Sequence, residues 1–289
     1  MSFILATDTS CDIPRGELRA RGIEYKPLVY TIEGAEHPDE FDCDEQYKAF
    51  YSEIRAGKLA STSMINLIEH EEFFTMLVDK YTEDIVYVTL SSGLSASHSS
   101  AVQAAENVFK STGRKVYVVD SRGATIMTRH VVDEAQKLRD SGLSAQEAVE
   151  QLADFVAHLQ TWFMPVDLMH LKRGGRVSGP AAIIGTALKI KPILNFSEAG
   201  GLVVAKKIHG VAKGLAFMID MFKADAVDGP SKFYIANADS EYAPELLERA
   251  KEARPDWEGE IGWIGPVIGA HTGCGAVGIS FLSKKTRDK

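Results

Sequence analysis

Residues 85–95 read IVYVTLSSGLS, an almost uniformly apolar run followed by hydroxyl-bearing and glycine residues. A short apolar run bounded by polar residues predicts a strand buried on both faces, as in a parallel sheet. Apolar side chains then recur at helical spacing on Ala101, Val102, Ala105, Val108 and Phe109. The segment therefore predicts a strand followed by a helix, the unit from which α/β folds are built.

The same alternation extends through the first half of the chain. Further strands are expected at residues 3–7, 25–32 and 116–119, and helices at 14–21, 44–56, 67–81, 123–141 and 145–159. Strands that alternate with helices predict a parallel sheet flanked by helices, with right-handed crossovers. We expect this N-terminal α/β domain to comprise residues 1–160.

The second half, residues 161–289, is predicted to form a smaller α/β domain. Strands are expected at residues 161–165, 191–196, 202–207, 232–236, 260–264 and 276–282, and helices at 179–188, 211–222 and 244–253. Gly200-Gly201 predicts a hairpin turn between two of these strands. The glycine-rich segment 265–275 is interpreted as a loop.

Composition excludes several classes of function. The net charge of −8 disfavours nucleic acid as the main partner, because phosphate backbones require basic patches. The three cysteines show no spacing typical of a disulfide framework or a zinc site, and no phosphate-binding glycine motif is present. We therefore expect no metal and no cofactor. The early charge at Asp8 and the lack of a long apolar run predict a cytoplasmic protein.

Hydroxyl groups follow several of the predicted strands. They lie in Asp8-Thr9-Ser10, in residues 91–95 and in Asp120-Ser121, and Ser61-Thr62-Ser63 precedes a predicted helix. Ligands of open α/β sheets bind beyond the carboxyl ends of the strands, and hydroxyls with helix N-terminal amides suit an anion. The alternative is that each such residue only caps a helix or a turn. Several clusters on one edge favour a site.

A rival interpretation makes Ser92 or Ser95 the nucleophile of a serine hydrolase of acyl esters, with His271 as its base. The segment lacks the order G-x-S-x-G, and no ordered acid partner is visible. His271 lies among Gly269, Gly273 and Gly275, which suggests close approach of the backbone to another group.

The turn Lys172-Arg173-Gly174-Gly175-Arg176 is strongly basic in an acidic chain. A solvated loop is the simplest interpretation. The alternative is a docking patch for an acidic partner or a phosphate.

Together these motifs resemble those of the DegV family, bacterial fatty-acid-binding proteins that serve fatty acid kinase. The resemblance runs through nearly the whole chain, in order. It is carried by residues 7–12, 61–63, 90–95, 119–121, 171–179, 191–194 and 265–273. The chain departs from the family pattern at Met64-Ile65, where Gln-Pro is common, at Ala96-Ser97, where Gly-Thr is common, and at Cys274, where proline is frequent.

The resemblance implies a two-domain DegV-like α/β fold, with a mixed sheet in the second domain and a long-chain fatty acid in a buried tunnel. It implies that the carboxylate is bound by the residues equivalent to Ser61, Thr62, Ser63, Ser92, Gly93 and Ser95, with His271 nearby. Arg173 and Arg176 would then dock the fatty acid kinase, which phosphorylates the carboxylate to an acyl phosphate. The chain itself would be a non-catalytic carrier whose contact with membranes is transient at most.

Physical chemistry is consistent with such a ligand. Each buried methylene contributes about 0.8 kcal/mol, so a long acyl chain is retained with few polar contacts. A buried carboxylate is costly unless it is paired. The sequence supplies hydroxyl and amide donors but no obvious buried lysine or arginine at the strand ends. We therefore expect neutral donors, rather than a cation, to hold the headgroup.

Overall fold

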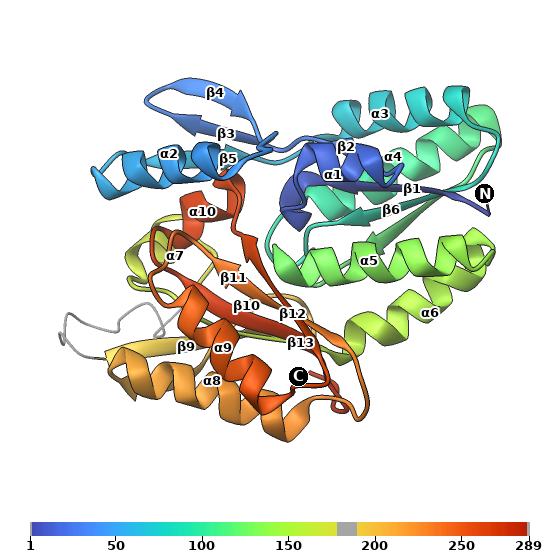
Figure 1. Ribbon diagram of the computed structural model, residues 1–289. Coiled ribbons are helices and arrows are strands. Elements are labelled where there is room, and N and C mark those ends of the chain that lie inside the picture. The colour runs from blue at the N-terminus through green and yellow to red at the C-terminus, as the bar shows by residue number, and fades with distance from the viewer. Residues whose placement is uncertain (1, 178–189, 288–289) are drawn as a thin grey trace.

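The fold was analysed in a computed structural model, which describes residues 2–177 and 190–287 (Figure 1). The predicted helix at 179–188 lies outside the described residues. Three sheets are present in the described part, with helices between and outside them. The chain is α/β, as predicted from the alternation of strands and helices.

Sheet A, in the first half, is four-stranded and parallel, with the order β2-β1-β6-β7. Its strands are β1 (Ile4–Asp8), β2 (Glu24–Lys26), β6 (Ile85–Thr89) and β7 (Val116–Asp120). Alternate residues of β1 face opposite layers: Ile4 and Ala6 pack with α3 (Leu67–Lys80) and α4 (Ser97–Thr112), and Leu5 packs with the other helix layer. That layer consists of α5 (Ile126–Asp140) and α6 (Ala145–His158). The predicted parallel sheet is confirmed.

A small antiparallel sheet, with the order β4-β3-β5, differs from the prediction. It contains β3 (Val29–Ile32), β4 (Ala35–Pro38) and β5 (Ala60–Ser63), and α2 (Asp44–Arg55) packs beside it. The single strand expected at 25–32 is wrong, because the chain leaves sheet A after β2 and pairs with different neighbours from Val29 onward. Pro27 stands between the two strands and has no N–H to donate to a ladder.

Sheet C, in the second half, is mixed and has the order β10-β9-β8-β13-β11-β12. Its strands are β8 (Leu159–Met164), β9 (Ile190–Phe196), β10 (Leu202–His209), β11 (Lys232–Asn237), β12 (Glu258–Trp263) and β13 (Val277–Leu282). The predicted hairpin is confirmed as the antiparallel pair β9–β10. The boundary predicted near residue 160 falls where β8 begins.

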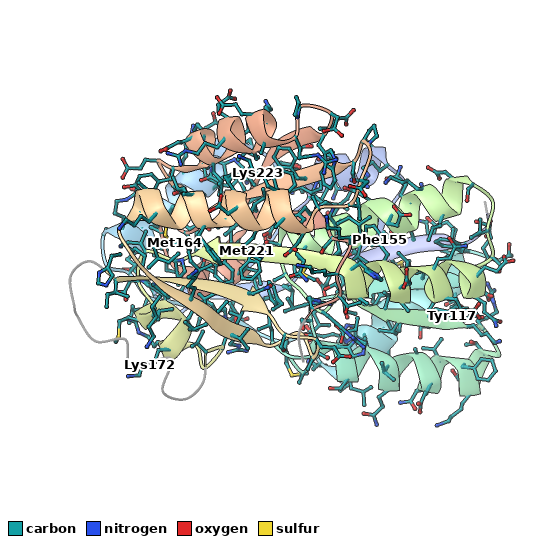
Figure 2. The ribbon with its side chains drawn as sticks, turned by 90° about the horizontal axis from the view of Figure 1, so that it is seen from below. Tyr117, Phe155, Met164, Lys172, Met221 and Lys223 are labelled. Carbon is teal, nitrogen blue, oxygen red and sulfur yellow. The ribbon has the colours of Figure 1, made fainter. Side chains whose placement is uncertain are left out.

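The two faces of sheet C are covered by different parts of the chain. On the outer face, α8 (Val211–Asp225) and α9 (Ala243–Ala253) lie side by side, as Figure 2 shows from below. Phe233 and Ile235 of β11 point to these helices, whereas Tyr234 and Ala236 point to the first half of the molecule. Because successive side chains of a strand point to opposite faces, alternate residues of β11 pack either in the core under α8 and α9 or in the junction of the two halves.

Short helices occupy the junction itself. They are η1 (Thr9–Cys11), α1 (Arg15–Ala20), α7 (Met169–Arg173) and α10 (Pro266–Thr272). The interpretation of residues 265–275 as a loop is wrong over α10. Pro266 stands at the first helical turn, where a fixed φ favours a helix, and Gly273 ends the helix at φ 70°.

The loop after β6 meets the β9–β10 turn backbone to backbone. The hydroxyl of Ser91 donates to the carbonyl of Gly200 at 2.8 Å. A Cβ atom added at Gly93 would lie 2.5 Å from the carbonyl carbon of Gly200 and 2.5 Å from the nitrogen of Gly201. No side chain fits at position 93 unless one of the two segments moves.

Gly93→Ala is expected to lower the free energy of unfolding by about 1–3 kcal/mol, because backbone atoms cannot rotate away from the new methyl group. Gly201→Ala is the matched control in the same contact, since its Cβ would first meet the Ser197 hydroxyl at 3.8 Å. Urea denaturation followed by circular dichroism measures both. Equal stabilities of the two variants would contradict this account of the junction.

Candidate functional site

A hollow lies between the inner face of sheet C, α10 and the loops that follow β5, β6 and β7. About 840 Å³ of its volume, part of it open to solvent, is free of protein atoms. The wall is mainly apolar, and its apolar residues are Leu28, Met64, Leu90, Leu94, Ala124, Phe163, Leu171, Phe196, Leu202, Ala236, Ile264, Val267, Ile268 and Val277. These residues come from both halves of the chain, so the hollow exists only when the halves are packed together.

Four polar residues of the wall together form what we call the polar mouth: Thr62, Ser95, Arg176 and His271. The Thr62 hydroxyl lies 2.8 Å from Nε2 of His271. Arg176 donates from Nε to the carbonyl of Leu94 at 3.1 Å, next to Ser95 in the chain. Two elements, β5 and α10, and two loops therefore bring hydroxyl, imidazole and guanidinium groups to the wall.

The local folding of each segment explains these positions. β5 alternates in exposure, so Thr62 turns inward while Ser61 and Ser63 are exposed. His271 lies in the last turn of α10, and a Cβ at Gly174 would collide with its ring. Arg176 follows the turn after α7 and donates from a terminal nitrogen to the carbonyl of Gly174 at 2.5 Å. The glycine lets the turn approach the imidazole closely.

His271 is neutral near pH 7. Burial, with a smaller contribution from the charge of Arg176, lowers the pKa of His271 to about 4. In the neutral ring one nitrogen donates and the other accepts, and the hydrogen bond to Thr62 fits either arrangement. An anion placed in the polar mouth would meet the fixed charge of Arg176, two hydroxyls and an imidazole able to donate.

The predicted site residues divide between the wall and the surface. Thr62, Ser63, Ser95 and His271 line the hollow. Ser61, Ser92 and Gly93 do not, and all three are exposed. The Ser92 hydroxyl donates to a carboxylate oxygen of Asp120 at 2.6 Å, and the amide of Gly93 donates to the Ser91 hydroxyl at 3.1 Å. These groups are already engaged with their neighbours.

The two arginines of the basic turn are separated by the fold. Arg173 is exposed in the last turn of α7, whereas Arg176 is half-buried in the wall of the hollow. The sequence showed no buried lysine or arginine at the strand ends, and Arg176 reaches the wall instead from the turn after α7. Sequence reasoning missed this because the inward path of Gly174–Arg176 depends on packing against His271 and Leu94, which local sequence does not reveal.

The serine hydrolase arrangement is not assembled in the described residues. Ser92 is bonded to Asp120, the Ser95 hydroxyl lies 3.1 Å from that of Ser97, and His271 is bonded to Thr62. No carboxylate contacts the ring of His271 within residues 2–177 and 190–287. The geometry thus lacks both the nucleophile–base contact and the group that orients the base.

The carboxylates of Asp8 and Asp120 accept hydrogen bonds from backbone amides. Asp8 caps η1 through the amide of Ser10 at 3.0 Å and accepts from the amide of Leu90 at 2.8 Å, which ties the end of β1 to the end of β6. Asp120 accepts from the amide of Arg122 at 2.8 Å as well as from Ser92. Both acids shape the loops beside the hollow.

No cluster of histidine, cysteine and acidic side chains among the described residues is suited to hold a metal ion. No described helix is long and apolar enough to cross a membrane.

Comparison with known proteins gives consistent matches along the chain. The model of a family described as "Uncharacterised protein, DegV family" matches residues 2–284. A DegV domain-containing protein of Clostridium perfringens is 33% identical over 283 residues, which cover 97% of each chain. The crystal structure of DegV, a fatty acid binding protein from Bacillus subtilis, has a TM-score of 0.85 at 29% identity, covering 98% of this chain and 100% of that one.

A third match is a DegV family protein from Thermus thermophilus, whose structure concerns its fatty acid binding. It has a TM-score of 0.87 at 25% identity and covers 98% of this chain and 100% of its own. The family model thus extends over all three sheets and over every segment of the polar mouth.

The lowered pKa of His271 predicts how stability depends on pH. Between the unfolded value of 6.5 and the folded value of about 4, the unfolded chain binds a proton that the folded, ligand-free chain does not. Stability is therefore lost as the pH falls through this window. We expect the unfolding free energy of the wild type, relative to that of His271→Asn, to fall by about 1–3 kcal/mol between pH 7 and pH 4.

Urea titrations of both delipidated proteins across this range test the effect. The variant provides the control for every other titrating group. A difference between the two proteins that does not change with pH would show that the imidazole is not desolvated.

Proposed function

Because the chain belongs to the DegV family, we propose that it binds a long-chain fatty acid in the hollow, with the carboxylate in the polar mouth. One observation carries the proposal: an apolar hollow between the two halves whose polar wall residues include Thr62, Ser95, Arg176 and His271. The solved DegV proteins of Bacillus subtilis and Thermus thermophilus, described as fatty acid binding, support it.

The apolar wall accounts for retention of the tail. Burying about fifteen methylenes contributes on the order of 12 kcal/mol before the costs of association. Side chains such as Phe163, Phe196 and Leu202 would replace water around the chain. A tail in this wall needs no hydrogen bond, so the polar mouth alone determines which end of the ligand is held there.

The polar mouth accounts for the headgroup. A carboxylate has about four lone-pair sites, and a buried one is costly unless these sites are paired. Thr62 and Ser95 supply hydroxyl donors, His271 a neutral imidazole and Arg176 a charge. Arg176 was predicted from the family resemblance to dock a kinase, but its place in the wall favours contact with the carboxylate.

We further propose that the chain is a carrier and not itself a catalyst. Its partner would be a fatty acid kinase, in which a carboxylate oxygen attacks the terminal phosphorus of ATP. The bond from that phosphorus to the bridging oxygen breaks, and ADP leaves with the electron pair. Arg173, exposed on α7 beside Lys172, is the residue we propose for docking this partner (Figure 2).

Thr62→Val and Ser95→Ala are each expected to weaken binding of palmitate or oleate about tenfold, because one hydrogen bond to a charged group is lost. Ser99→Ala is the control, since this exposed hydroxyl on α4 donates to the carbonyl of Ala96 away from the hollow. Native mass spectrometry of the purified protein gives the lipid content, and titration of delipidated protein gives the affinity. A protein that carries no fatty acid and takes up neither ligand would overturn the proposal.

Arg173→Glu is expected to slow phosphorylation of the bound fatty acid by a purified fatty acid kinase about tenfold, because charge reversal opposes docking. The matched control is Lys223→Glu, which reverses an exposed charge on α8, on the outer side of sheet C. Formation of acyl phosphate is measured at equal fatty acid loading. An equal rate for both variants would place the kinase on another surface.

A further inference from the structure

One hydroxyl in the wall of the hollow differs from the others. Six wall residues carry a hydroxyl group: Thr62, Ser63, Ser95, Thr125, Thr161 and Thr272. Thr62 is bonded to His271, and Ser95 lies within hydrogen-bonding distance of Ser97. Thr161 donates to Ser280 at 2.9 Å and Thr272 to the carbonyl of Gly273 at 3.4 Å.

Thr125 is the exception. Ser63 also lacks a side-chain partner, but it is exposed to solvent, whereas Thr125 is only 7% exposed. The Thr125 hydroxyl has no partner among residues 2–177 and 190–287. It does not cap α5, although Thr125 occupies the N-cap position of that helix. The Thr125 hydroxyl is also accessible from the hollow, unlike the two carboxylate oxygens of Asp12, which are fully covered by protein atoms.

The backbone at Thr125 is strained. Its φ of 55° and ψ of −129° are a conformation that a β-branched residue rarely adopts. Two hydrogen bonds hold it there: the Thr125 amide donates to the carbonyl of Ser10 at 2.7 Å, and its carbonyl accepts from the amide of Arg129 at 2.9 Å. Strain of this kind persists where the surroundings impose it and is concentrated at ligand sites.

The separation between Thr125 and the polar mouth can be estimated from the length of α10. The residue after Thr125, Ile126, is next to Gly262, and Asp12 is next to Gly265, so this region borders the N-terminal end of α10. His271 lies in the last turn of the same helix. Seven helical residues span ~10 Å, and an extended chain advances ~1.2 Å per bond, so Thr125 lies about eight bonds from the headgroup.

We propose that Thr125 forms a subsite for a hydroxyl group in the middle of the acyl chain, an inference that rests on the proposed function. The ligand class is then the mid-chain hydroxy fatty acids, with Thr125 as the residue that selects them. A water molecule is a poor occupant, because it needs two to four polar partners and the wall there offers one free hydroxyl. A ligand hydroxyl needs only the one partner, since a threonine hydroxyl both donates and accepts.

This subsite would make affinity depend on the position of the hydroxyl group along the acyl chain. A hydroxyl group buried in an apolar wall without a partner costs about tenfold or more in affinity. At the carbon opposite Thr125 this cost is offset by a hydrogen bond. We expect the wild type to bind 10-hydroxystearate about as tightly as stearate, and to bind 6-hydroxystearate and 14-hydroxystearate about tenfold more weakly.

The variant Thr125→Val removes the hydroxyl and keeps the shape. It is expected to raise the ratio of dissociation constants, 10-hydroxystearate over stearate, about tenfold. Thr125→Ser retains the hydroxyl and is expected to keep the wild-type ratio. Thr161→Val is the matched control, because it removes a wall hydroxyl that is already bonded to Ser280, and the ratio is expected not to change.

Titration calorimetry on delipidated full-length protein measures each ratio. Equal losses for all three hydroxystearates in the wild type, or the same ratio in Thr125→Val and the wild type, would overturn the subsite while leaving fatty acid binding intact. Failure of stearate itself to bind would instead overturn the proposed function, and the subsite with it. The wild-type position series decides the question even if a variant does not fold.

Discussion

The inner face of sheet C must be covered by the other half of the chain, and the rest of the structure depends on this constraint. α8 and α9 cover the outer face only. The inner face is met by α5, α10 and the loops of sheet A (Figure 1), and these segments leave the hollow unfilled. Protein interiors otherwise pack with few voids larger than a water molecule. The hollow is therefore a product of how the two halves meet.

Buried polar groups in the wall of the hollow are costly unless they have hydrogen-bond partners, and most of those in this wall have them. Within the described residues, four of its six hydroxyls are bonded to another side chain or to the backbone, and of the other two only Thr125 is buried. The imidazole of His271 avoids the cost of a buried charge by remaining neutral. Arg176 contacts the backbone carbonyls of Leu94 and Gly174 through its guanidinium group. Most polar groups of the wall are thus paired within the protein.

Much of the fold follows from local sequence, because apolar periodicity reports which faces are buried. It located the strands of sheet A, most of sheet C and the longer helices. It failed at 25–32, where Pro27 separates two strands that belong to different sheets. It failed again at α10, where Gly269 and Gly273 suggested a loop. Tertiary contact explains these glycines, since a Cβ at either would press on Tyr51 or His170.

The candidate site was harder to predict from the sequence than the fold, because its geometry depends on tertiary contacts. Hydroxyls at strand ends pointed to the edge of sheet A at which the hollow lies, and Thr62, Ser95 and His271 line that hollow. Exposure alternates along a strand and varies along a loop, so Ser61 and Ser92 could not be separated from their neighbours by composition. The turn that brings Arg176 inward and the backbone strain at Thr125 depend on distant contacts and leave no local signal.

The contact of Gly93 with the β9–β10 turn has a consequence for evolution. Two backbones touch there with no side chain between them, so Gly93 cannot be replaced while the turn stays in place. A larger residue at 93 becomes acceptable only together with a longer or displaced turn. The same loop carries Ser95, and the displaced strand carries Leu202, so such a paired change would reshape the ligand compartment as well. If the hollow holds a fatty acid as proposed, new lipid preferences at this junction should arise by coordinated insertion and substitution rather than by single replacements.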